Sequence, residues 1–480
     1  MNLDKAQIQS VVEQVVRSIV ADQNNTAPAL ISPPARYEGK GDHGLFDTLE
    51  DAVQAASEAQ RALEALSLEQ RRAIISAIRT EAMAHAKGIA QKTLEETGMG
   101  RVAHKIRKFE VVVQHTPGVE DLQPVAWTGD HGLTVVEMAP FGVIGAVTPS
   151  THPVPTMVNN AISFIAGGNS AVFAPHPGAK NISAIGLQML NRAIVGAGGP
   201  PNLLTAVREP SIQTAQALFV HPQVSLILVT GGGGVVKAAM QAPKRVIAAG
   251  PGNPPVVVDE TADIQNAAKS IVAGAAFDNN ILCIGEKEVF VVQSVADELK
   301  RNLLSNKCVE LDRAQIDALA KVAFPRDAKG DWSINRELVG RNPHVLAAQI
   351  GLNIAPDTEL LIGEVEASHD FVQHEQMMPF LPIVRTPDVH TAIEWGVQAE
   401  QGYHHTAIMH SKNVEYMTKM ARLCRCTIFV KNGPSSAGLG AGGEGYTSFS
   451  IATPTGEGCT SARTFTRQRR CALIDYFRIV

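Results

Sequence analysis

Short apolar runs alternate with amphipathic stretches through the middle of the chain, and this alternation predicts the fold. The apolar runs have the length of buried strands, and the stretches between them repeat with helical spacing. Strands that alternate with helices form parallel βαβ units, so we expect an α/β protein with a doubly wound sheet. The predicted strands lie at 171–173, 203–207, 225–229 and 245–247, and the predicted helices at 155–166, 180–196, 211–219 and 234–241.

Two helices are expected before this alternation begins. Thr48–Asp51 and Ser67–Gln70 both have the form of a capping box, and a long amphipathic stretch follows each of them. The second helix should end near Gly98. A two-part extended region, 133–138 and 142–147, then leads into the first βαβ unit.

A second alternation of strands and helices follows Pro254 and continues to about residue 435, which predicts a second α/β lobe. Beyond it, Gly, Thr and Ser interrupt residues 438–461, as is typical of loops and short strands. A chain of 480 residues is long enough for two or three lobes with substantial cores.

The first twenty residues have a different pattern. Apolar residues between Leu3 and Val20 recur on one helical face, which predicts an amphipathic helix. Residues 21–36 are rich in Asn, Ala and Pro, which predicts a flexible tether. An amphipathic helix on a tether favours docking to a partner, while an extra helix on the domain surface is the alternative. Lys5 and Arg17 are the basic residues of its polar face, which is few for a helix that binds lipid.

Composition narrows the class of protein. The net charge of -5 gives no reason to expect a nucleic-acid partner. The six cysteines are scattered without framework spacing, which favours the reducing cytosol, and no zinc-like ligand spacing predicts a metal site. No run of ~18 apolar residues predicts a membrane span, and the N-terminus lacks the features of a secretory signal.

Cys283 is the candidate nucleophile. It ends the segment Phe277–Cys283, which joins a helical pattern to the strand-like residues 288–292. A thiol at an element boundary can be reached by a substrate, whereas a thiol inside an apolar run is usually inert packing. If Cys283 reacts, the chain is an enzyme that works through a thioester.

Two glycine-rich segments compete as the nucleotide site. Gly438–Gly443 has the spacing G-x-G-x-x-G, but residues 444–448 do not open a helix, so we reject it. Thr230–Gly234 directly follows a predicted strand and precedes a helix, where backbone N–H groups can face a phosphate. A tight turn without a ligand is the alternative for this second segment.

Several blocks, in order along the chain, resemble the NAD(P)-dependent aldehyde dehydrogenase superfamily, over about residues 44–480. That resemblance implies a five-stranded dinucleotide-binding domain, a catalytic α/β domain and a small β-flap that builds homodimers or homotetramers. The blocks are PFGVI at 140–144, TPSTHP at 148–153, AGGNS at 166–170, the glycine turn after Thr230, residues 250–254, the Cys283 loop and EQMMP at 375–379.

The resemblance also implies roles for individual residues. Cys283 would be the nucleophile, and Thr151 would stand where relatives carry an asparagine that helps hold the oxyanion. Gly231 and Gly232 would lie beside the pyrophosphate of NAD, and Glu375 would hold the nicotinamide ribose. The other cofactor-binding residues implied are Thr148, Pro149, Ser150 and Gly250.

One departure from the family changes the expected reaction. Hydrolytic members carry a glutamate general base where this chain has Ala248, and an alanine cannot activate water. A thiol ionises more easily than water and is a strong nucleophile, so the Cys283 thioester should pass to coenzyme A. Blocks at 404–407, 431–435, 451–458 and 460–465 resemble the CoA-acylating branch in particular.

Within that branch the sequence resembles most the propionaldehyde dehydrogenases of propanediol-utilisation microcompartments, with the acetaldehyde enzymes of ethanolamine utilisation as the alternative. In those relatives an N-terminal helix docks to the shell protein, which implies this role for residues 1–20 and a microcompartment within the cytoplasm. His404 and His405 are candidates for a group beside CoA, although hydrogen-bonded structure is the favoured interpretation. Ile281 and Leu282 would neighbour the substrate.

The resemblance also predicts the domain boundaries. They are an encapsulation helix at 1–20, a linker at 21–38, an NAD-binding domain at 39–117 and 139–252, a catalytic domain at 253–442, and an oligomerisation flap at 118–138 and 443–480.

Overall fold

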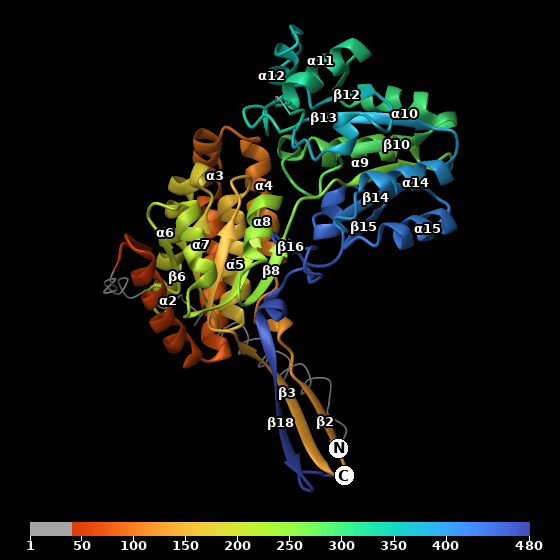
Figure 1. Ribbon diagram of the computed structural model, residues 1–480. Helices are drawn as coiled ribbons and strands as arrows, with labels where there is room; N and C mark the ends of the chain where they lie inside the picture. Colours follow the sequence, from red (N-terminus) through yellow and green to blue (C-terminus); the bar gives the residue numbers. More distant parts are fainter. Residues whose placement is uncertain (1–40, 328) are drawn as a thin grey trace, which may run out of the picture. The chain divides into compact units, whose positions relative to one another are not determined.

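The computed structural model describes residues 41–327 and 329–480, which all belong to one compact unit. The helix expected at 1–20 and the linker at 21–38 lie outside the described residues. The described part is an α/β structure with two parallel sheets, a three-stranded antiparallel sheet and a two-stranded antiparallel sheet formed by β16 and β17 (Figure 1), which confirms the predicted fold class. Among the described helices, none combines the length and apolar character that crossing a membrane requires.

The first parallel sheet has six strands in the order β1-β6-β5-β4-β7-β8. The resemblance implied five; the sixth is β1, which pairs with β6 at the sheet edge and is too short at two residues to give a sequence pattern. The four predicted strands of this sheet are confirmed. The strands are β1 (Leu45–Phe46), β4 (Val143–Thr148), β5 (Ser170–Pro175), β6 (Leu204–Val207), β7 (Val224–Thr230) and β8 (Arg245–Ala249).

Helices cover both faces of this sheet. One layer contains α3, α4, α5 and α6, and the other contains α2, α7 and α8. Thr48 caps α2, and Ser67 with Gln70 forms the capping box of α3, which ends at the left-handed Gly98 as predicted. The helices are α2 (Leu49–Glu64), α3 (Leu68–Thr97), α4 (Val102–His115), α5 (Pro153–Ala166), α6 (Lys180–Gly196), α7 (Ile212–Val220) and α8 (Gly233–Ala239).

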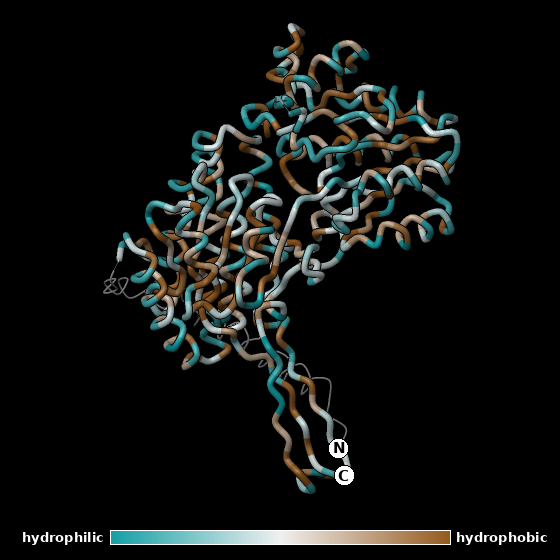
Figure 2. The backbone as a smooth tube through the Cα atoms, viewed as in Figure 1, coloured by the Kyte–Doolittle hydropathy of each residue, from teal (hydrophilic) through white to brown (hydrophobic). Residues whose placement is uncertain are grey.

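The second parallel sheet confirms the predicted second lobe. It has seven strands in the order β11-β12-β13-β10-β9-β14-β15. Figure 2 shows hydrophobic residues along the central strands of both parallel sheets, as expected of sheets buried on both faces. The strands are β9 (Pro255–Val258), β10 (Glu288–Val292), β11 (Cys308–Glu310), β12 (Leu360–Glu364), β13 (Phe380–Thr386), β14 (Thr406–His410) and β15 (Ile428–Lys431).

Helices α9 and α10 pack on one face of this second sheet, and α11 to α15 contribute to the core on the other. The connection from α9 to β10 contains the 3₁₀ turn η3 (Phe277–Asn280) and then Cys283. The helices are α9 (Ile264–Ala275), α10 (Gln293–Ser305), α11 (Arg313–Ala323), α12 (Pro343–Ala348), α13 (Asp370–Gln373), α14 (Val389–Ala399) and α15 (Val414–Cys424).

The third sheet is antiparallel, in the order β18-β3-β2. The predicted two-part extended region divides between sheets, because β3 belongs here and β4 belongs to the first parallel sheet, with Gly142 at φ 121° between them. The predicted domain boundaries remain predictions. The remaining strands are β2 (Val125–Gly129), β3 (Gly132–Pro140), β16 (Ile451–Ala452), β17 (Gly458–Cys459) and β18 (Thr466–Ile474), and the remaining 3₁₀ turns are η1 (Val119–Asp121), η2 (Pro177–Ala179), η4 (Ser435–Leu439) and η5 (Ala462–Phe465).

Candidate active site

Cys283 lies just beyond an unusual backbone turn. Asp278, Asn279 and Asn280 all adopt left-handed conformations, with φ of 50°, 57° and 65°. Asn and Asp tolerate this region better than other side chains, because their short polar groups bond locally. The turn redirects the chain after α9 and leaves Cys283 partly accessible in an otherwise buried segment.

The turn's own asparagine side chains hold its conformation through hydrogen bonds to other segments. Asn279 donates from Nδ2 to Gly340 O at 2.8 Å and to Asn342 Oδ1 at 2.8 Å. Asn280 donates from Nδ2 to Glu286 O at 2.9 Å, which closes the loop around Cys283. A conformation that is costly for three successive residues persists only when its surroundings fix it, and these bonds do so.

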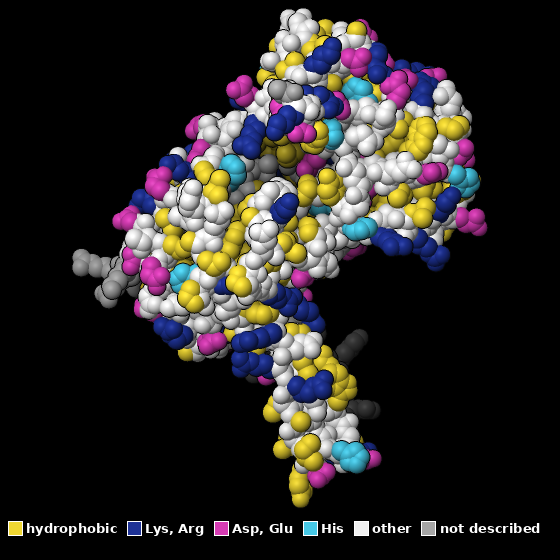
Figure 3. Space-filling view, in the orientation of Figure 1, with side chains coloured by type: hydrophobic (Ala, Val, Ile, Leu, Met, Phe, Trp, Pro, Cys, Tyr) yellow, Lys and Arg dark blue, Asp and Glu magenta, His cyan; other side chains and the backbone are white. Residues whose placement is uncertain are grey.

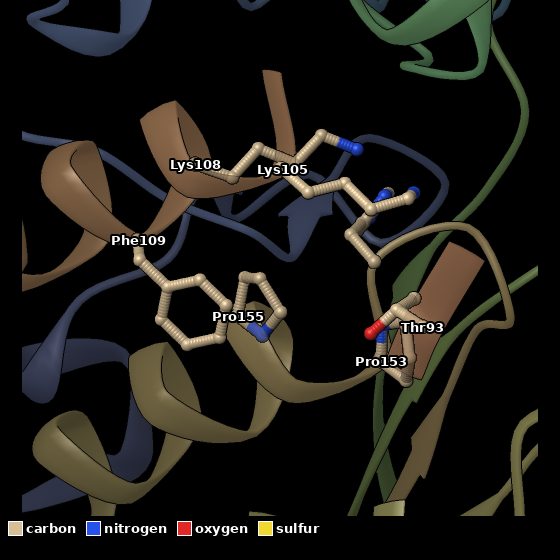
Figure 4. A pocket seen from close by; sticks show the side chains of 7 residues that line it. Thr93, Lys105, Lys108, Phe109, Pro153 and Pro155 are labelled. Carbon is tan, nitrogen blue, oxygen red and sulfur yellow. The ribbon is translucent and has the colours of Figure 1, made fainter. Parts of the chain in front are cut away.

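Asp278 anchors the turn to helix α4. Its Oδ2 lies 2.5 Å from Lys108 Nζ and 3.1 Å from Lys105 Nζ, and all three side chains are buried. Lys105 and Lys108 line a small pocket with Phe109 on α4, seen in Figure 4. Burial, reinforced by Lys105 and opposed by Asp278, lowers the pKa of Lys108 to about 8. These ion pairs connect helix α4 to the cysteine loop, residues 277–283, which precedes strand β10 of the second sheet.

The same lysine connects the cysteine loop to strand β4. Lys108 Nζ donates to Thr151 O at 3.5 Å, and the Thr151 hydroxyl lies 3.0 Å from His152 Nδ1. Burial, together with Lys108 and Lys105, holds the pKa of His152 well below its usual value. Thr151 and the cysteine loop therefore share one buried polar neighbourhood.

The predicted nucleotide-binding residues gather at the carboxyl ends of β4 and β7. These strands are adjacent and parallel, and the chain proceeds outward from them in opposite directions along the sheet, which makes their junction the topological switch point. Ligands of doubly wound sheets bind at such a point. Thr148 is the last residue of β4, and Pro149 and Ser150 follow it. Gly231 and Gly232 follow β7, and Gly250 follows β8.

The glycine turn after β7 is open. Gly232 caps α8, and a Cβ added there would meet no atom within 4 Å. At Gly231 a Cβ would lie 2.8 Å from the Val235 side chain, and its N–H donates to Ala249 O at 3.1 Å. NAD fits these residues, since the turn leaves its backbone accessible at the switch point.

Three candidate residues meet around Gly252. A Cβ on Gly252 would lie 2.7 Å from Cys283 O and 2.8 Å from His405 Cγ, so no side chain separates those two groups. The Gly252 N–H donates to Glu375 Oε1 at 3.4 Å. Glu375, His405 and the Cys283 loop thus surround one glycine, although they come from separate parts of the second lobe.

The two adjacent histidines differ in position. His405 is fully buried, its Nδ1 lies 2.9 Å from Thr406 Oγ1, and its Nε2 has no hydrogen-bond partner among the described residues. Burial, with a contribution from Lys287, lowers its pKa to about 4, so the ring is neutral near pH 7. His404 instead faces Cys424 O, with Nδ1 at 3.3 Å. The structure brings only His405 beside the cysteine loop.

Opposing influences set the ionisation of Cys283. Burial raises the pKa of its thiol to about 12, and the Glu375 carboxylate acts in the same direction. Lys287 and Lys108 act in the opposite direction. These influences favour the protonated thiol near neutral pH, and its reactivity depends on the positive charge around it.

Ala248 lies near the end of β8 and is fully buried. Its N–H donates to Thr455 Oγ1 at 3.0 Å, and its methyl group can neither take nor give a proton. Ile281 is also buried and packs near Gly340, whereas Leu282 keeps part of its surface accessible. Glu286 accepts two hydrogen bonds from Ser435, both at 2.8 Å, which is a structural role.

Three buried charged residues of this region escaped the sequence interpretation: Asp278, Lys108 and Lys287. Lys108 is separated from Asp278 by most of the first lobe, and nothing in the local pattern of α4 shows that this lysine points inward. The signal that could have revealed Lys287 is its place at the start of an apolar strand, where a lysine is costly unless it has partners.

Comparison with known proteins gives consistent matches. Residues 40–311 match the aldehyde dehydrogenase family. The chain is 51% identical over 98% of its length to the acetaldehyde dehydrogenase (acetylating) EutE of Salmonella typhimurium, of which the whole length is matched.

Two solved structures are also similar. One is a propionaldehyde dehydrogenase from the fucose utilisation microcompartment of Clostridium phytofermentans, with a TM-score of 0.89 and 45% identity over 91% of this chain and 100% of that one. The other is the Rhodopseudomonas palustris propionaldehyde dehydrogenase with bound propionyl-CoA, with a TM-score of 0.88 and 45% identity over 90% of this chain and 96% of that one.

Proposed function

Because the chain belongs to the aldehyde dehydrogenase family, we propose that it oxidises a short-chain aldehyde with NAD and transfers the acyl group to coenzyme A. One observation carries the second half of this proposal. The Cys283 loop meets Glu375 and His405 around Gly252. The family resemblance further implies that the buried Ala248 stands where hydrolytic relatives carry the glutamate that activates water.

The first half-reaction begins at Cys283. Its sulfur adds to the aldehyde carbonyl carbon, and the resulting oxyanion accepts hydrogen bonds from the Cys283 N–H and the Thr151 hydroxyl. Collapse of the oxyanion expels hydride and leaves a thioester on Cys283. NAD, when bound, supplies the hydride acceptor. The residues that would hold it are Gly231 and Gly232 at the pyrophosphate, Glu375 at the nicotinamide ribose, and Thr148, Pro149, Ser150 and Gly250 at the surrounding sheet edge.

The second half-reaction releases the acyl group. Hydrolysis of the thioester needs a general base, which typically contributes ~10²–10⁴ in rate, and Ala248 cannot provide one. A thiol acceptor removes most of that need, because a thiolate forms easily and attacks strongly. His405 has a neutral ring with an Nε2 that has no hydrogen-bond partner among the described residues, which suits it to orient the CoA thiol. Ile281 and Leu282 would border the acyl chain.

The decisive experiment supplies propanal and NAD with and without CoA and follows NADH and acyl products. We expect NADH and propanoyl-CoA with CoA, and only slow NADH formation after the first turnover without it. Comparable steady NADH formation without CoA, with free propanoate as product, would contradict the transfer. As a control, C283A should lose turnover by roughly 10³-fold or more while keeping the parent's melting temperature. A fully active C283A would refute the role of Cys283.

We propose propanal as the preferred aldehyde, with acetaldehyde as the second candidate. The similar solved structures support propanal, whereas the higher identity of the acetylating relative, 51% against 45%, favours acetaldehyde. The ratio of kcat/KM for the two aldehydes distinguishes them. One methylene in an apolar pocket changes this ratio by ~10–200-fold, so a ratio below one would reverse the assignment.

We also propose that residues 1–20 dock the enzyme to a microcompartment shell protein. The amphipathic pattern between Leu3 and Val20 supports this, as does the microcompartment source of a similar structure. A variant lacking residues 1–20 should keep its kcat/KM and no longer co-purify with shell fractions. If it remains with the shell to the same extent as the parent, residues 1–20 are not the docking segment.

A further inference from the structure

Lys287 is a buried cation directly behind the cysteine loop. It precedes β10, its exposed fraction is 0%, and it is among the largest fully buried side chains. Its ammonium donates to Asn280 O at 2.8 Å, to Leu282 O at 3.2 Å and to Asn280 Oδ1. These acceptors are the last residue of the left-handed turn and the residue that immediately precedes Cys283.

Lys287 donates these hydrogen bonds to neutral acceptor groups. Within residues 41–327 and 329–480, no carboxylate lies within 4.0 Å of its nitrogen, unlike Lys105 and Lys108, which share Asp278. Burying an ammonium without a paired carboxylate is costly, and a neutral amide could donate to the same carbonyl groups. The charge itself therefore requires an explanation.

Several charged groups face this part of the loop. Burial lowers the pKa of Lys287, while Glu375, Cys283, Glu288 and Glu286 oppose that change. From the other side, Lys108 approaches Cys283, and its charge is partly balanced by Asp278. Among the cations, Lys287 has the larger influence on the thiol and lacks an ion-pair partner. Glu375 is the anion that works against it.

Building on the proposed function, we propose that Lys287 is a positioning residue for the Cys283 nucleophile. Its hydrogen bonds fix the turn that presents the sulfur, and its positive charge, which has no carboxylate in direct contact, stabilises the thiolate that must form beside Glu375. The residue touches neither substrate nor coenzyme and acts through the backbone and the field at Cys283. A lysine that merely fills space behind the loop would fix the turn without changing ionisation of the thiol.

The test compares K287Q with K287R. Iodoacetamide is applied to the coenzyme-free full-length protein over a range of pH, and mass spectrometry measures alkylation of the peptide that contains Cys283. K287Q keeps an N–H donor and removes the charge, so we expect its profile to shift to higher pH and its rate at pH 8 to fall about tenfold, which corresponds to one pKa unit. K287R keeps the charge and should restore most of the rate.

Lys244 provides the matched control. Its ammonium also donates to two backbone carbonyl groups, His221 O and Val224 O, but on the first sheet. K244Q should leave the profile of Cys283 unchanged. A K287Q profile that coincides with the parent's overturns the proposal. If K287Q does not fold, the alkylation profile of K287R tests the proposal instead. A K287R profile that is shifted to higher pH although the charge is retained also overturns the proposal.

Alkylation requires no turnover, which separates this proposal from the proposed function. If the parent forms no CoA-dependent product but the alkylation profile of K287Q is shifted, the proposed function fails and the role of Lys287 stands. Conversely, CoA-dependent turnover with an unshifted profile would refute only the role of Lys287.

Discussion

The position of Cys283 depends on residues that do not react with the substrate, some in the same loop and some far away in the sequence. Asp278, Asn279 and Asn280 bend the backbone, and partners on α4 and in the segment around Gly340 hold them in that conformation. The position of the sulfur is consequently set before substrate binds. Such preorganisation is what a covalent mechanism needs, because a displacement of one ångström at the attacking atom can cost about 10²-fold in rate.

Buried histidines give the protein a predictable response to acid. His410 ends β14, is almost fully buried, and neither ring nitrogen has a hydrogen-bond partner among the described residues. Burial lowers its pKa to about 4. As pH falls from about 6.5 to about 4, the unfolded chain takes up a proton at this site and the folded chain does not, so stability is lost in that window.

We predict that H410L reduces this loss. Two and a half pKa units correspond to ~3 kcal/mol, so the free energy of unfolding should fall by roughly 2–3 kcal/mol less in H410L than in the parent between pH 7 and pH 4.5. Urea denaturation at several pH values measures it. Other buried groups, including Glu286, are common to both proteins and cancel. Equal slopes would show that His410 does not titrate as proposed, and H85L, on the exposed face of α3, serves as control.

At the scale of elements, the junction between α3 and α4 couples the first lobe to the cysteine loop. Gly100 has φ of 82°, its N–H donates to Gly340 O at 2.8 Å, and Arg101 N donates to Asp278 Oδ1 at 2.7 Å. Arg101 also donates from Nε to Asn279 Oδ1 at 2.7 Å. Two lobes of the protein therefore meet in one short hydrogen-bonded segment.

Two glycine variants test this coupling. A Cβ on Gly100 would lie 2.1 Å from Asp278 Oδ1, so G100A should lower the free energy of unfolding by about 1–3 kcal/mol and slow aldehyde oxidation. Gly88 lies exposed within α3, and a Cβ there would meet no atom within 4 Å. G88A should raise stability by about 0.5–1 kcal/mol and leave the rate unchanged. Denaturation and NADH formation measure both effects, and a G100A protein as stable and active as G88A would contradict the coupling.

Local features of the fold could be predicted from the sequence, whereas contacts between distant segments could not. The helices that begin after Thr48 and Ser67 and the apolar strands of the first sheet follow from local sequence patterns and were predicted. The capping box formed at Ser67, whereas Thr48 caps its helix without the reciprocal bond from Asp51 to the backbone. The two-residue strand at Leu45 has no period to detect. The partnership of Lys108 with Asp278 depends on how distant segments pack, and the position of Lys287 depends on which way a single side chain turns. Cys283 could be identified as a candidate, but its supporting residues could not.

At the scale of the whole molecule, the sheet β18-β3-β2 leaves apolar surface exposed. Among the residues that the structure describes, β18 pairs with β3 alone, and all its residues after Thr466 are exposed. Figure 3 shows hydrophobic side chains exposed on this sheet. Trp127 of β2 and Ile474 of β18 have 54% and 65% of their surface accessible. An edge strand with apolar residues favours association with another chain. The sheet therefore supports the predicted homodimer or homotetramer.

A charge introduced on β18 should weaken this association. We expect the double variant L473D/I474D to have a smaller mass than the parent by size-exclusion chromatography with light scattering, because each carboxylate would have to be desolvated in an apolar contact. V414D is the control, since Val414 is equally exposed, at 66%, but lies at the start of α15. A monomeric parent would refute the oligomer, and an unchanged mass of L473D/I474D would place its interface elsewhere. If L473D/I474D dissociates and V414D does not, the sheet forms the interface. If alkylation of Cys283 in L473D/I474D also matches the parent, the sheet joins subunits without shaping the cysteine loop.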